Sequence, residues 1–148
     1  MLKQRLIDDL KAAMKEKDVI KKNVVTMIRA GILQIEKDNK IELDDEGIQD
    51  VIAKQLKQRK DALADFEKGA RDDLVAQTNK EIEILLSYLP AQLTKDELVE
   101  IVKQAIEDLN ITQMNQMGKL MSAVMPKVKG RADGKAINAV AKELLGNV

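Results

Sequence analysis

"LDDEGIQDVIAKQLKQRKDALADFEKG", Leu43 to Gly69, is the stretch that decides the fold. Its apolar residues recur at helical spacing, which predicts one long helix of about 24 residues. Asp44 or Asp45 is placed to cap this helix, and acids in its first turn favour the positive end of the helix dipole. Gly69 is typical of a helix end. The apolar residues at this spacing are Ile48, Ile52, Leu56, Leu63 and Phe66.

Two helical patterns precede this stretch, and one more lies between it and Pro90. The first runs from Leu2 until the pattern lapses at "KEKD", and the second begins at about Val19. Gly31 lies beside the apolar stripe of the second helix, where it would let a neighbouring element approach closely. The pattern after the long helix ends at "SYLP", because Pro90 lacks a donor and disfavours helix at the residue before it.

Three shorter helical patterns follow Pro90. "TKDE", Thr94 to Glu97, has the form of a capping box and opens the first of them. The second runs from about Thr112 to Met125. Asp133 is placed to cap the last helix.

Composition favours the same all-α fold. The 148 residues include only seven glycines and two prolines, and long stretches are rich in residues that lose little on entering a helix. We expect a helical hairpin-like domain of about four helices over residues 1–90, followed by a compact three-helix domain over residues 91–148.

The residue types exclude several function classes. The chain has no cysteine and no histidine, and Ser87 and Ser122 are its only serines, so the common nucleophiles, general base and metal ligands are missing. We expect no cofactor, no metal and no intrinsic enzymatic activity. An enzyme that uses carboxylates and lysines between the two parts stays open as a third hypothesis.

The sequence shows neither a start like a signal peptide nor a membrane-spanning run. No apolar run approaches the length of a membrane span, and the charged start is unlike a signal peptide. We therefore expect a cytoplasmic protein without membrane contact. The 25 basic and 25 acidic residues cancel, so any site for a polyanion must be local.

"MPKVKGRADGKAIN", Met125 to Asn138, concentrates positive charge. Five cations and one carboxylate lie between Lys119 and Lys135, a net charge of +4. The stretch is not a nucleotide-binding loop, because only three residues separate its glycines and Ala136 stands where a hydroxyl residue is needed. Cations beside a helix N-terminus still suit one phosphate group. The predicted RNA-binding residues are Gly118, Lys119, Lys127, Lys129, Gly130, Arg131, Gly134 and Lys135.

The alternative for this turn is structural. Gly130 would end one helix, Asp133 would cap the next, and the lysines would be solvated.

Four of the seven methionines lie at helical spacing: Met114, Met117, Met121 and Met125. Flexible thioethers suit an adaptable protein-interaction surface, and they also fill gaps in a small core. Both interpretations stay open here.

The basic run "KQLKQRK" suggests a second patch on the long helix. It contains Lys54, Lys57, Arg59 and Lys60, and acids such as Asp61 lie within helical reach, which favours a solvated face. One phenylalanine and one tyrosine cannot build a base-stacking platform. If the protein binds RNA, it should therefore contact phosphates and shape in a folded RNA.

These motifs resemble the YqeY family over close to the full chain. In the second half the resemblance rests on Met117, Gly118, Lys119, Met121 and "GRADG", Gly130 to Gly134. In the first half it rests on "KQR" at Lys57 to Arg59, Asp73-Leu74 and "YLP" at Tyr88 to Pro90. The family commonly carries Gly-Arg before the Asp-Leu pair, whereas this sequence reads "KGARDDL", which weakens any role for Arg71.

The resemblance implies an all-helical two-part fold whose second part is shared with the tail of the B subunit of tRNA-dependent amidotransferases. That tail helps to hold tRNA, so the resemblance implies tRNA, or amidotransferase and synthetase components, as partners. It carries over no catalysis, and a family label of carbon–nitrogen ligase would come from the tail alone. The first hypothesis is a non-catalytic tRNA-binding or amidotransferase-associated accessory protein. The second is a helical adaptor that uses the methionine face.

Overall fold

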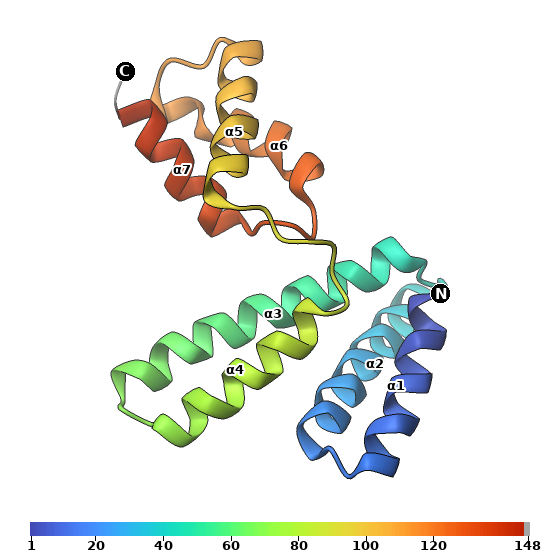
Figure 1. The fold of residues 1–148 in the computed structure, drawn as a ribbon. Helices are drawn as coiled ribbons and strands as arrows, with labels where there is room; N and C mark the ends of the chain where they lie inside the picture. Colours follow the sequence, from blue (N-terminus) through green and yellow to red (C-terminus); the bar gives the residue numbers. More distant parts are fainter. Residues whose placement is uncertain (147–148) are drawn as a thin grey trace. The chain divides into compact units, whose positions relative to one another are not determined.

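A computed structural model of the chain describes residues 1–146, and this part is all-helical, as predicted (Figure 1). Its seven α-helices are α1 (Leu2–Glu16), α2 (Val19–Asn39), α3 (Asp45–Lys68), α4 (Asp72–Leu86), α5 (Lys95–Leu109), α6 (Met117–Val128) and α7 (Gly134–Gly146). A short 3-10 helix, η1 (Met114–Gln116), precedes α6. No strand occurs in this described part.

The chain forms two compact units, which are described separately below. Unit 1 is Met1–Leu89, and unit 2 comprises the described residues from Pro90 onward. The assignment of residues 1–90 and 91–148 as separate domains stays a prediction, and its last two residues lie outside the described part.

Local side chains set the helix starts that the sequence predicted. The Asp44 carboxylate accepts a hydrogen bond from the Gly47 amide at 2.8 Å and caps α3. Thr94 and Glu97 form the predicted capping box of α5. The predicted helix from Thr112 begins later, at Met117, because the Gln116 side chain accepts the Thr112 amide at 2.9 Å and favours a 3-10 turn first. This helix also continues through Pro126 to Val128, where buried Val128 anchors the last turn.

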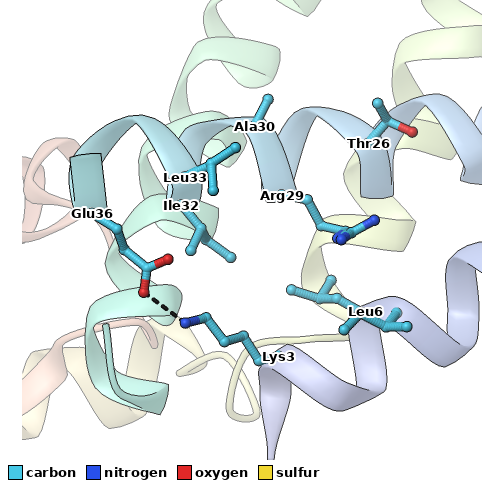
Figure 2. A pocket seen from close by; sticks show the side chains of 9 residues that line it. Lys3, Leu6, Thr26, Arg29, Ala30, Ile32, Leu33 and Glu36 are labelled. Carbon is cyan, nitrogen blue, oxygen red and sulfur yellow. Dashed lines mark hydrogen bonds and ion pairs between the residues drawn. The ribbon is translucent and has the colours of Figure 1, made fainter. Parts of the chain in front are cut away.

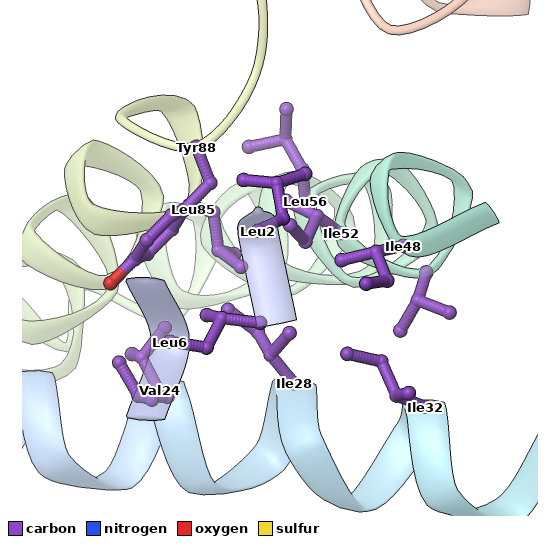
Figure 3. Packing of buried hydrophobic residues seen from close by; sticks show 12 residues of the cluster. Leu2, Leu6, Val24, Ile28, Ile32, Ile48, Ile52, Leu56, Leu85 and Tyr88 are labelled. Carbon is purple, nitrogen blue, oxygen red and sulfur yellow. The ribbon is translucent and has the colours of Figure 1, made fainter. Parts of the chain in front are cut away.

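The core of unit 1 lies between the α1–α2 hairpin and the α3–α4 hairpin (Figure 3). Gly31 of α2 faces α3, and a Cβ atom there would lie 3.0 Å from Val51 Cγ1 and 3.1 Å from Gln55 Nε2. This contact confirms the predicted close approach at Gly31 and brings the two hairpins together. The core residues are Leu2, Leu6, Val24, Val25, Ile28, Ile32, Ile48, Val51, Ile52, Leu56, Leu85 and Tyr88.

Tyr88 fastens the end of α4 to α1. This residue is 3% exposed, its hydroxyl donates to the Asp9 carboxylate, and the Arg5 guanidinium lies 4.6 Å from the ring centre. Arg5 also donates to the Ser87 carbonyl at 3.1 Å. Burial, followed by the hydrogen bond to Asp9, raises the pKa of Tyr88 well above its ordinary value. The phenol therefore stays a proton donor throughout the physiological range.

Replacing Tyr88 by Phe should test this contact. The ring and its packing remain, while the bond to a charged acceptor is lost, so the free energy of unfolding should fall by about 1.5 kcal/mol. Urea unfolding followed by far-UV circular dichroism measures the change. An unchanged midpoint would show that the Asp9 contact adds nothing to stability.

Candidate nucleic-acid interface

The turn between α6 and α7 is tight and favours glycine at position 130. The amides of Arg131 and Ala132 both donate to the Val128 carbonyl, at 2.8 and 3.1 Å. Gly130 has a φ angle of 76°, in the left-handed region that L side chains rarely adopt. The predicted helix end at Gly130 therefore has a backbone cause.

The segment that leads into α5 packs on this turn. Leu93 donates its amide to the Arg131 carbonyl at 2.9 Å, and Gln92 Nε2 donates to the Gly130 carbonyl at 2.7 Å. Arg131 Nε donates in return to the Ala91 carbonyl at 3.1 Å. The half-buried Arg131 guanidinium therefore takes part in holding unit 2 together. No local sequence pattern indicated these contacts, which join residues about 40 positions apart.

Asp133 caps α7, as predicted. Its carboxylate accepts from the Ala136 amide at 2.8 Å, and its carbonyl accepts from the Ile137 amide at 3.2 Å. A carboxylate already faces the positive end of the helix, where a phosphate would otherwise bind. Any phosphate contact at this turn therefore depends on the cationic side chains rather than on the helix end.

Three of the predicted lysines are exposed and have no ion-pair partner in the described chain: Lys119, Lys127 and Lys135. Lys129 is exposed as well. Negative charge is concentrated on α5, because residues Lys95–Leu109 contain five carboxylates and only two cations. Positive charge in unit 2 is thus concentrated on α6 and the turn.

Gly118 is exposed in the first turn of α6, and nothing lies within 4 Å of the position that a Cβ atom would occupy. Its φ angle is not positive, so neither packing nor backbone geometry requires glycine. Glycine costs helix stability relative to alanine, by about 0.5–1 kcal/mol. Gly134 is also not required, because a Cβ atom there would meet Met121 Cε only at 3.7 Å, an ordinary contact.

The four predicted methionines do not share one exposed face. Met117 and Met121 pack partly buried against the core of unit 2. Met114 and Met125 are 45% and 41% exposed, and Met114 belongs to η1 rather than to α6. The adaptor surface stays a prediction that can involve only these last two side chains without disturbing packing.

The basic run on α3 is partly structural. Arg59 forms an ion pair with Glu81 of α4, and its Nη2 donates to Met27 Sδ at 2.9 Å. Arg59 therefore links three helices, and its partner comes from α4 rather than from the acids of α3. Within residues 1–146 no group of His, Cys, Asp or Glu could hold a metal ion. Among the same residues no helix has the length and apolarity of a membrane span.

The fold and the turn define an all-helical protein in which a lysine-bearing turn joins the last two helices of a three-helix unit. The chain belongs to the YqeY family: the family model described as Yqey-like protein matches residues 3–145.

Curated relatives agree with this membership. "Altered inheritance of mitochondria protein 41, mitochondrial" of Pyrenophora tritici-repentis is 31% identical over 96% of this chain and 80% of its own length. The protein of the same name from Kluyveromyces lactis is 34% identical over 89% of this chain and 69% of its own length. A glutamyl-tRNA(Gln) amidotransferase polypeptide of Methanococcus maripaludis is 30% identical over 60% of this chain, but over only 14% of its own length.

The expected cytoplasmic localisation is wrong by this comparison, because the relatives that match most of the chain are named as mitochondrial proteins. The expectation rested on the lack of an apolar signal. That argument addresses secretion and membrane insertion, whereas mitochondrial targeting uses amphipathic, basic segments.

Alanine substitutions at the two glycines of the turn should show which glycine is needed for its backbone conformation. Gly130→Ala forces an L side chain into the left-handed region and should lower the free energy of unfolding by about 1 kcal/mol. Gly134→Ala, the matched control, should change it by less than about 0.5 kcal/mol. Urea unfolding monitored by far-UV circular dichroism gives both values, and equal losses would contradict the assignment.

Proposed function

We propose that this protein is a non-catalytic accessory protein that binds folded RNA, tRNA in particular, through Lys119, Lys127 and Lys135 of unit 2. The observation that carries the proposal is the exposure of these three lysines without ion-pair partners in the described chain. A lysine with no partner loses no internal contact when a phosphate approaches, so its charge is fully available for binding.

The relative from Methanococcus maripaludis supports tRNA as the RNA class, since its name places it in a tRNA amidotransferase. The match covers 14% of that polypeptide, which is too little to bring an amidotransferase active site. The label of carbon–nitrogen ligase therefore belongs to the larger relative. The chain's residue types agree, because they offer no histidine, cysteine or serine cluster for acyl or amide transfer.

The scarcity of aromatic residues supports a particular mode of RNA binding. The chain has one tyrosine, which is buried, and one phenylalanine, so bases cannot be held between aromatic side chains. Binding should therefore depend on phosphates and weaken steeply with salt. Three neutralised phosphates correspond to a fall in log affinity of about two to three units per log unit of salt.

Neutralising the three lysines together should abolish most RNA affinity. We expect the variant Lys119→Gln, Lys127→Gln, Lys135→Gln to bind total tRNA at least about tenfold more weakly at about 100 mM salt, with a salt slope below about one. Fluorescence anisotropy over a salt series measures both quantities. Arg131 is left intact, because its contact with Ala91 makes its loss ambiguous.

The matched control removes three exposed lysines of unit 1: Lys11→Gln, Lys37→Gln and Lys54→Gln. It changes the net charge equally, so a purely global charge effect would weaken both variants alike and would contradict the assigned surface. No binding by the unaltered protein at low salt would overturn the proposal as a whole.

Gly118 gives an independent test of where the RNA backbone lies. Gly118→Ala should raise the free energy of unfolding by about 0.5–1 kcal/mol, because the added methyl group meets nothing and alanine is the better helix former. If RNA approaches α6 beside Lys119, the same methyl group should weaken tRNA binding. A more stable variant with unchanged affinity would move the contact away from this turn of α6.

A further inference from the structure

The outer side of the α1–α2 hairpin carries a pocket that the RNA-binding surface does not use. It has a cavity volume of about 370 Å³ and lies wholly within unit 1. This volume falls at the lower end of the range found for small-molecule sites, about 300–1,000 Å³. The surface that lines it is mostly apolar, and four of its nine lining residues are polar or charged: Lys3, Thr26, Arg29 and Glu36.

The apolar part of the pocket combines core and surface side chains. Leu6 and Ile32 form buried positions of the unit 1 core, while Leu33 is 68% exposed. Ala30 also lines the pocket. Figure 2 shows Ile32 of α2 and Leu6 of α1 facing the space between the two helices. An apolar group that filled this space would cover Leu33.

One end of the pocket holds an ion pair that is already satisfied. Lys3 Nζ lies 2.6 Å from Glu36 Oε2 (Figure 2). Glu36 Oε2 also accepts a hydrogen bond from the Leu43 amide at 2.8 Å. The hydrogen bond from Lys3, and next the Leu43 amide, lowers the pKa of Glu36, and the bond to Glu36 raises the pKa of Lys3. Both groups are therefore charged at neutral pH and form an ion pair.

Arg29 differs from this pair. It lines the same pocket and is exposed, and its guanidinium has no hydrogen-bond or ion-pair partner in the part of the chain that the structure describes. Arg29 and Glu36 are seven residues apart on α2, roughly 10 Å along the helix axis. The pocket thus has an uncompensated cation toward one end and an apolar space between that cation and the Lys3–Glu36 pair.

We propose that this pocket binds an amphipathic monoanion, namely a medium-chain alkyl carboxylate, with its carboxylate on Arg29 and its chain over Leu6, Ile32 and Leu33. The planar guanidinium suits two-point recognition of a carboxylate. The chain removes the exposed Leu33 side chain from water, and each buried CH₂ group adds to affinity by the hydrophobic effect. An uncharged chain of equal length gains only the apolar part, and a cationic chain is in addition repelled by Arg29.

The test uses the full chain and two probes of equal length, sodium octanoate and 1-octanol. Methyl NMR spectra should show octanoate-dependent shifts at Ile7 and Ile32, which both line the pocket, with none at the core residue Ile137 of unit 2. Octanoate should bind about fivefold more tightly than octanol, the contribution of one partly exposed ion pair. Arg29→Gln should remove this difference and leave octanol affinity unchanged, whereas Lys54→Gln should change neither.

Leu33→Ser should weaken the binding of both probes about three- to tenfold, since it removes an exposed apolar side chain that lines the pocket. Val19→Ser is the matched control, because Val19 is 63% exposed and lies outside the pocket. Equal affinity for octanoate and octanol, or shifts spread over both units, would overturn the proposal. Binding of an amphipathic peptide without any octanoate binding would overturn it as well and identify the pocket as a protein-docking groove.

Discussion

Unit 1 depends on the close approach of α2 and α3 at Gly31. A Cβ atom there would lie 3.0 Å from Val51 Cγ1 and 3.1 Å from Gln55 Nε2, so a larger residue would force these side chains to shift by a few tenths of an ångström. Because α2 uses this side for the core, the apolar residues on its other side, Leu33 above all, stay outside it. The same crossing therefore explains both the tight core and the open pocket on the α1–α2 hairpin.

In unit 2 the turn after α6 both forms structural hydrogen bonds and carries exposed positive charge. The carbonyls of Gly130 and Arg131 hold the segment that enters α5, while Lys127 and Lys135 carry no ion-pair partner in the described chain. Some residues of this short motif therefore form hydrogen bonds that hold unit 2 together, while others are exposed to solvent. Proximity in sequence alone does not separate these two groups, and Arg131 belongs largely to the first.

The sequence could predict features that depend on neighbouring residues. The caps at Asp44, Thr94 and Asp133 are local hydrogen bonds between residue types that favour helix starts, and all three are present. The start of α6 was missed because a glutamine side chain, at Gln116, folds back on the preceding turn. The contacts of Arg59 with Glu81 and of Arg131 with Ala91 join distant positions, so no local pattern could indicate them. The pocket beside Arg29 needs two helices in register and was missed for the same reason.

The position of Tyr88 has a spectroscopic consequence. The chain contains one tyrosine and no tryptophan, and that tyrosine lies in the core of unit 1. Its ultraviolet emission therefore reports the local environment of unit 1 only, while unit 2 is silent at these wavelengths. Backbone circular dichroism responds to both units. Comparing the two signals in a single denaturant titration would show whether the units unfold together or in sequence, without any added label.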